Sequence, residues 1–165
     1  EMSGSVFNVT VDSCFFGGYG SDFAGIHLKT TRGRGGSIHA IRFRNIFIDG
    51  SNSTKQPRPL SVAMFYGGGD QKPTNATATP RVYDISFENI TAILPELHRK
   101  LFPAFNFVGL PESPMKNFRF RDIVARGKSL GWSCSDTSDF GFSGTIVPAP
   151  GPECAGTESL TSHLK

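Results

Sequence analysis

Two basic side chains stand two positions apart in a short apolar segment, and their spacing suits recognition of an acidic ligand. His27 and Lys29 alternate with Ile26 and Leu28. Successive side chains of a β-strand point to opposite faces, so the two basic groups share one face while the apolar pair faces the core. Two cations on one face can hold a carboxylate, such as that of an acidic sugar. A solvated strand face is the alternative interpretation of the same residues.

A complete set of catalytic groups is missing from the sequence. Inverting hydrolysis of a glycosidic bond needs two carboxyl groups about 6.5–9.5 Å apart, but the 14 Asp and Glu residues form no adjacent pair in the strand repeat described below. His39, His98 and His163 lack the Ser, Cys or Asp surroundings typical of nucleophilic catalysis. Because no Cys and His residues have zinc-ligand spacing, we predict no metal site and no cofactor.

A ten-residue pattern recurs four times, beginning at Ser5, Ser37, Arg81 and Pro114. Apolar residues occupy positions 2, 5, 7 and 10 of each copy, and the central alternation predicts a half-buried strand. Small polar residues tolerate unusual φ, so a sharp turn is expected just before position 10. The residues at this predicted turn are Ser13, Asn45, Asn89 and Asp122.

Each copy of the pattern is followed by a second predicted strand. These four segments are 25–30, 60–66, 103–108 and 140–147. Short strands in coils of about 30 residues predict an all-β parallel solenoid, in which like residues stack about 4.8 Å apart. One consequence is an outward ladder of alternating charge formed by Asp12, Arg44, Glu88 and Arg121.

We divide the chain into coils over residues 1–132 and a Pro/Gly-rich cap and tail over 133–165. The cap would cover the last coil, but nothing before Glu1 could cover the first, so we expect these coils to be the C-terminal part of a longer protein. Gly33-Arg34-Gly35-Gly36 lacks the Lys-Ser/Thr of a phosphate-binding loop, and we predict a tight turn there.

Composition and processing signals favour a secreted protein. The net charge of +3 over 165 residues is too small to indicate a nucleic-acid binder, and no apolar stretch is long enough for a membrane helix. Asn-x-Ser/Thr acceptors begin at four asparagines, of which the second and third lie in loops and are the best candidates for glycosylation: Asn8, Asn52, Asn75 and Asn89.

The three cysteines suggest one disulfide and one unpaired thiol. Cys134 and Cys154 flank a Gly/Pro-rich segment, and a bond between them would close a loop of about 20 residues and contribute roughly 3 kcal/mol. Cys14 lies at an apolar strand position and is predicted to be a buried free thiol. A partner outside this sequence is the alternative.

Several motifs together resemble the C-terminal half of the polygalacturonases, glycoside hydrolase family 28, especially its plant-type members. The segment 25–30 is similar to that family's Arg-Ile-Lys strand, and the Gly-Arg-Gly-Gly at 33–36 follows it. The segment 109–114, the Asn-Ile-x-Phe-x-Asn-Ile phrases and the Pro-rich tail to Cys154 also fit. The resemblance covers about residues 1–154.

This resemblance implies a right-handed parallel β-helix and a secreted or wall-associated hydrolase, monomeric when complete, that cleaves α-1,4-galacturonan in pectin with inversion. It gives Lys29 the role of binding the substrate carboxylate, and it places His27 where the family has arginine. Tyr66 corresponds loosely to a substrate-contacting tyrosine. The catalytic aspartates and the Gly-His-Gly histidine would lie upstream, so the chain alone is expected to be inactive.

Three alternatives stay open. The chain could belong to a catalytically inactive carbohydrate-binding β-helix, which His27 in place of arginine favours. It could also belong to a hydrolase of rhamnogalacturonan or xylogalacturonan. A purely structural adhesin-type solenoid is disfavoured by the context of Lys29.

Overall fold

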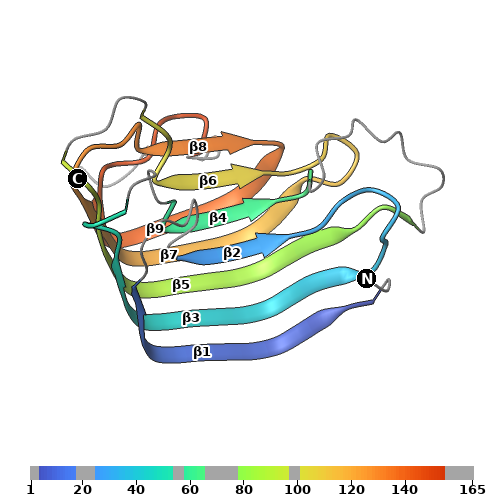
Figure 1. Cartoon of the computed structure of the whole chain (residues 1–165). Helices are drawn as coiled ribbons and strands as arrows, with labels where there is room; N and C mark the ends of the chain where they lie inside the picture. The colour runs from blue at the N-terminus through green and yellow to red at the C-terminus, as the bar shows by residue number, and fades with distance from the viewer. Residues whose placement is uncertain (1–3, 18–24, 54–57, 66–77, 97–100, 155–165) are drawn as a thin grey trace, which may run out of the picture.

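The protein is all-β, as the sequence predicts, and its strands form two parallel sheets. The computed structural model describes residues 4–17, 25–53, 58–65, 78–96 and 101–154. In Figure 1 the short strands of one sheet lie beside the long, curved strands of the other. Within the described ranges, no helix has the length and apolar character needed to cross a bilayer.

Five long strands make the first sheet, in the order β1-β3-β5-β7-β9. They are β1 (Val6–Gly17), β3 (Ser37–Asp49), β5 (Arg81–Ile93), β7 (Met115–Arg126) and β9 (Thr137–Val147). Four short strands make the second sheet, in the order β2-β4-β6-β8. They are β2 (Ile26–Lys29), β4 (Leu60–Ala63), β6 (Phe105–Val108) and β8 (Trp132–Ser135). The chain therefore alternates between the two sheets, adding one strand to each in turn.

The strand register confirms the repeat read from the sequence. Val6 pairs with Ile38 and Ile38 with Val82, so equivalent positions of successive copies are neighbours. The predicted charge ladder is also present, because Asp12 pairs with Arg44, Arg44 with Glu88, and Glu88 with Arg121. Arg44 Nη2 lies 2.8 Å from Asp12 Oδ2, and Arg121 forms an ion pair with Glu88.

The predicted sharp turns lie inside the long strands as single residues with left-handed backbone. Ser13, Asn45, Asn89 and Asp122 have φ of 54°, 55°, 52° and 55°. A second set of left-handed residues, which we did not predict, bends the same strands nearer their beginnings: Asn8, Ala40, Asp84, Asn117 and Asp139. The long strands are therefore bent twice, and the sheet curves around the core.

The prediction for 140–147 was wrong. This segment lies in β9, which pairs with β7 in the long sheet, and the second strand of that coil is β8. β9 carries an additional residue, since Arg121 pairs with Ser143 whereas Ile123 pairs with Ile146. Gly144 accommodates the irregularity with φ of 66°, and Thr145 N donates to Asp122 Oδ1 at 2.8 Å. β8 and β9 also carry both sheets beyond the boundary that we placed at residue 132.

The core between the sheets is built from stacked phenylalanine side chains. Ring centroids of Phe43 and Phe87 are 5.3 Å apart, those of Phe87 and Phe120 are 5.4 Å apart, and those of Phe120 and Phe142 are 5.0 Å apart. These rings occupy one register position in four neighbouring strands. Parallel stacking of identical side chains thus fixes the register as well as filling the interior.

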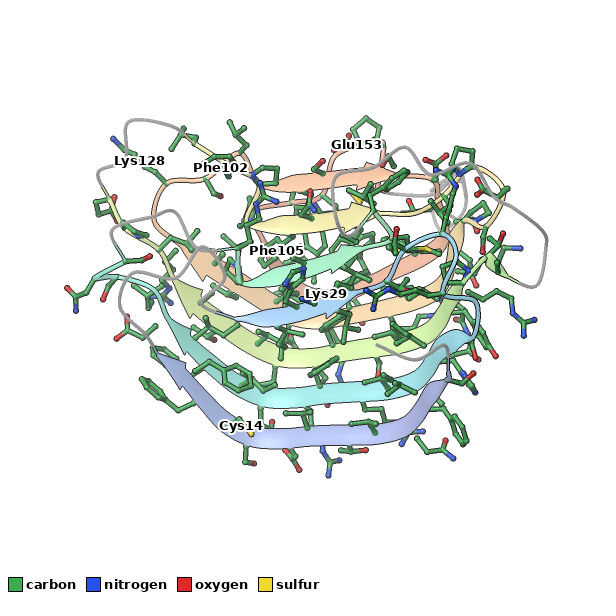
Figure 2. The ribbon with its side chains drawn as sticks, turned by 45° about the vertical axis from the view of Figure 1, so that its right-hand side comes forward. Cys14, Lys29, Phe102, Phe105, Lys128 and Glu153 are labelled. Carbon is green, nitrogen blue, oxygen red and sulfur yellow. A yellow bond between two sulfur atoms is a disulfide. The ribbon has the colours of Figure 1, made fainter. Side chains whose placement is uncertain are left out.

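The core is covered at one end and exposed at the other. Cys134 and Cys154 form the expected disulfide at the C-terminal end, where Cys154 is buried. At the β1 edge, the core-facing Val6 and Val9 remain 52% and 37% exposed, whereas Ile41 in β3 is 2% exposed. Cys14 is a free thiol on β1 (Figure 2), partly buried against the core, and it donates to Asp12 O at 3.3 Å.

The Gly33–Gly36 segment forms a tight turn between β2 and β3, as predicted. Gly33, Gly35 and Gly36 all have positive φ, and the backbone N–H groups of the first two donate to Ala78 O at 2.9 Å. A Cβ atom at Gly36 would meet Gly4 O at 2.1 Å. Glycine is therefore required where this turn approaches the neighbouring chain segment.

Candidate functional site

The candidate site is the outer face of the short sheet, where His27 and Lys29 project as predicted. Ile26 on the opposite face is 5% exposed and belongs to the core, and Leu28 packs against it. His27 is half-buried and Lys29 is exposed on β2 (Figure 2). The alternation expected from the sequence is therefore observed.

Through strand pairing, each of the two basic residues belongs to a row of side chains that runs across the sheet. The first row contains His27, Ser61, Asn106 and Ser133. The second contains Lys29, Ala63, Val108 and Ser135. The outer face of the short sheet thus combines a polar row with a row that is polar at both ends and apolar in the middle.

A close backbone contact holds β2 in this arrangement. Ile26 N donates to Pro59 O at 2.8 Å, which begins the pairing with β4. A Cβ atom at Gly25 would lie 2.2 Å from the same carbonyl oxygen. Glycine at position 25 is therefore what allows β2, and the basic residues that it carries, to approach β4.

Arg58 adds a third basic side chain beside the two that the sequence indicated. Its charge, like that of Lys29, contributes to lowering the pKa of His27, so the three groups interact electrostatically. The guanidinium carbon of Arg58 lies 5.1 Å from the ring centroid of Phe102, which orients the side chain through a cation–π contact. Arg58 is far from both Phe102 and His27 in the sequence, so residue spacing alone does not indicate this arrangement.

The pKa of His27 lies below its usual 6.5, chiefly because burial disfavours the charged imidazolium. Repulsion from Lys29 and then from Arg58 lowers it further. His27 is therefore neutral at pH 7 in the free protein. A bound anion near these groups would offset both effects and would favour protonation.

Ser61, the neighbour of His27 in the polar row, has an unmet hydrogen-bonding requirement. The residue is 1% exposed, and among the described residues its Oγ has no hydrogen-bond partner. An unpaired buried hydroxyl costs about 1–3 kcal/mol. Sequence reasoning missed Ser61 and Arg58, since only the pairing of β4 with β2 brings them to the basic residues.

Neither row of the short sheet contains Asp or Glu, so the described rows offer no carboxylate for general acid or base catalysis. Asp12 and Asp139 form ion pairs on the long sheet, and Glu112 pairs with Arg32. Within the described ranges, no group of three or more His, Cys, Asp or Glu side chains is arranged to hold a metal ion.

The structure separates the other predicted site residues. Tyr66 and Asn75 lie outside the described residues. Asn52 is exposed in a turn, and Asn8 is exposed on β1 with φ of 56°. The side-chain nitrogen of Asn89, which a glycan would occupy, instead donates to Asn45 Oδ1 at 2.9 Å.

A scan against protein-family models finds no match to this chain, and searches of curated proteins and of solved structures find none either.

Proposed function

We propose that this chain forms the C-terminal coils of a polygalacturonase-like hydrolase of pectin and that the outer face of its short sheet binds galacturonate. The observation that carries this proposal is the group of three basic side chains, His27, Lys29 and Arg58, on a face whose described rows contain no acid. Such a face suits a polyanion, because neighbouring cations can hold its carboxylates through charge-assisted hydrogen bonds.

The proposed fold is a right-handed parallel β-helix. Alternation between two parallel sheets, with one strand added to each per coil, supports a helix of stacked coils. Parallel strands joined by a crossover in one sheet are right-handed in about 98% of cases, which supports the hand. The motifs shared with the polygalacturonases favour the same architecture.

The catalytic carboxylates would come from coils that pack on β1. Val6 and Val9 face the core but are 52% and 37% exposed, and a preceding coil would bury them as β3 buries the other side of β1. Such a coil would also pair the open backbone edge of β1. The described chain would then supply one side of the substrate cleft. The preceding coils would form the other side and carry the carboxylates for acid–base catalysis.

Secretion to the cell exterior or wall is consistent with two features. The Cys134–Cys154 disulfide is of the kind that persists in oxidising compartments. Asn8 and Asn52 are exposed at Asn-x-Ser/Thr sequences and could carry glycans. We also propose that the complete enzyme is a monomer and that it needs no cofactor.

Reading the codons upstream of Glu1 tests this proposal first. Further coils with Asn-Thr-Asp, Asp-Asp and Gly-His-Gly motifs would support a hydrolase. The encoded protein should then release reducing ends from polygalacturonate, and Lys29→Ala should raise KM roughly tenfold or more, the loss expected for a charged hydrogen bond. Lys128→Ala, which removes a lysine beyond β7, is the control. Replaced aspartates in a protein that still binds polygalacturonate would favour the carbohydrate-binding alternative.

The residue at position 27 provides a separate test in that longer protein. Because His27 is neutral at pH 7, His27→Arg should restore a permanent positive charge and lower KM for polygalacturonate above pH 6.5. An unchanged pH profile of KM would place His27 outside the substrate-binding site. Activity measured on polygalacturonate, rhamnogalacturonan and xylogalacturonan distinguishes the alternatives. A rhamnogalacturonan or xylogalacturonan hydrolase would prefer its own polysaccharide to polygalacturonate.

A further inference from the structure

A basic pocket lies where β5 and β7 begin, apart from the rows of the short sheet. Its volume is about 400 Å³, which is in the range of small-molecule sites. The lining residues are Arg81, Val82, Tyr83, Glu112, Ser113, Pro114 and Lys116. Arg81 and Tyr83 alternate with the buried Val82 and share the outer face of β5, and Lys116 of β7 is the strand neighbour of Tyr83.

The pocket has an excess of positive charge. Its one carboxylate, Glu112, accepts hydrogen bonds from Arg32 Nε at 2.5 Å and from Arg32 Nη2 at 2.8 Å, so its charge is balanced from outside the pocket lining. Arg81 and Lys116 are exposed, and neither forms an ion pair with another described residue. The lining therefore presents two uncompensated cations.

The walls of the pocket are held in place before any ligand binds. Leu110 and Ser113 exchange backbone hydrogen bonds of 3.4 and 2.9 Å, and Ser113 Oγ donates to Pro80 O at 2.8 Å. The Tyr83 ring stacks on His39 with centroids 4.8 Å apart and an interplanar angle of 8°. A preorganised wall reduces the entropy lost on binding.

We propose that this pocket binds the carboxylate group of a uronate sugar, as a site additional to the one on the short sheet. Arg81 and Lys116 would hold the carboxylate, because two cations beside one aromatic side chain favour an anionic group on a partly apolar ring. Tyr83, with Val82 and Pro114, supplies apolar surface for the sugar ring. The choice of uronate rests on the proposed function, whereas the positive charge of the pocket does not.

The test is an amide NMR titration of the 165-residue chain with trigalacturonate. Galactotriose, which lacks the carboxylates, and inorganic sulfate serve as comparison ligands. The variants are Arg81→Ala/Lys116→Ala for this pocket and Lys29→Ala for the short sheet. Arg42→Ala/Arg126→Ala removes two exposed arginines elsewhere on the long sheet and is the control for net charge.

We expect trigalacturonate to shift the amides of Tyr83, Ser113 and Lys116. The Arg81→Ala/Lys116→Ala variant should weaken this binding at least tenfold, whereas Lys29→Ala and the arginine control should preserve it. Shifts at Tyr83 and Lys116 without shifts on β2 would support this pocket and contradict the proposed function. Shifts confined to β2 and β4 would overturn the pocket and leave the proposed function standing. Equal affinity for sulfate, or for galactotriose, would overturn uronate as its ligand.

Discussion

Asn89 donates its side-chain amide to Asn45 Oδ1 at 2.9 Å, across 44 residues of sequence. Asn45 in turn donates to Asp12 Oδ1 at 2.9 Å, so side chains at or beside the turns of three neighbouring long strands are joined. Both asparagines have positive φ, which costs about 1–2 kcal/mol for most residues and is best tolerated by Gly, Asn and Asp. Asparagine therefore suits both the left-handed backbone of the bend and the hydrogen bond to the neighbouring strand.

Replacing Asn45 should therefore destabilise the protein through two separable effects. Asn45→Ala loses both hydrogen bonds and places Ala at φ of 55°, so we expect the free energy of unfolding to fall by roughly 2 kcal/mol. Asn45→Gly tolerates the backbone and should lose only about half as much. Urea denaturation of the two variants measures the difference. Equal losses would show that the positive φ carries no cost here.

Ala40 is the exception among the bends nearer the strand beginnings, where the other residues are Asn or Asp. It has φ of 52° without a side chain suited to it, so Ala40→Asn should stabilise the protein by about 0.5–1 kcal/mol. Ala40→Val, which places a β-branched residue at the same φ, should destabilise it. Thermal or urea unfolding checks both signs, and a stabilising valine would refute the explanation.

The Arg32–Glu112 ion pair should make stability depend on pH in the acidic range. Hydrogen bonds from Arg32 lower the pKa of Glu112 to about 2 from its usual 4.5. A lowered pKa means that the pair contributes stability above about pH 4.5 and that this contribution is lost as the pH falls toward 2. Glu112→Gln should therefore lose less stability than the wild type between pH 5 and pH 3.

The expected difference is modest, roughly 0.2–1 kcal/mol, because the pair lies near the surface. Urea midpoints measured at both pH values provide the comparison. Glu96→Gln, at an exposed position, controls for the loss of one carboxylate. If Glu112→Gln and the wild type lost stability in parallel, the pair would contribute nothing.

The cysteines predict a simple labelling result. Only Cys14 is free, so denatured, unreduced protein should take up one thiol reagent per chain, and reduced protein should take up three. Mass spectrometry counts the adducts. Cys134→Ser/Cys154→Ser should lower the free energy of unfolding by about 3 kcal/mol through loss of the loop constraint. Three adducts without reductant would contradict the disulfide.

The sequence predicted the stacking register because apolar residues recur at positions 2, 5, 7 and 10 of each copy. That alignment placed Asp12, Arg44, Glu88 and Arg121 at one position, and the strand pairs confirm it. The earlier bend was missed because Ala40 interrupts its series of Asn and Asp residues. A bend of this kind leaves no signal in hydrophobic alternation.

Strand β9 was misplaced for a related reason. Thr137 occupies a position that is apolar in the other copies, and the additional residue near Gly144 delays the last apolar side chain to Ile146. β8 is as short as the other strands of its sheet, but Trp132 is its only large apolar side chain, so it was not recognised. The candidate site was predicted only in part, since Arg58 and Ser61 reach His27 through pairing of segments distant in sequence.

The most direct test of a uronate-binding face on the short sheet is an NMR titration of the His27 imidazole, with and without saturating trigalacturonate. In the free chain the pKa of His27 should lie below 6.5, because burial and the charges of Lys29 and Arg58 oppose protonation. A carboxylate bound beside these groups should raise that pKa, so affinity should increase as the pH falls between the free and bound values. Galactotriose should leave it unchanged. A pKa of His27 that is the same with and without saturating trigalacturonate would contradict binding at this face.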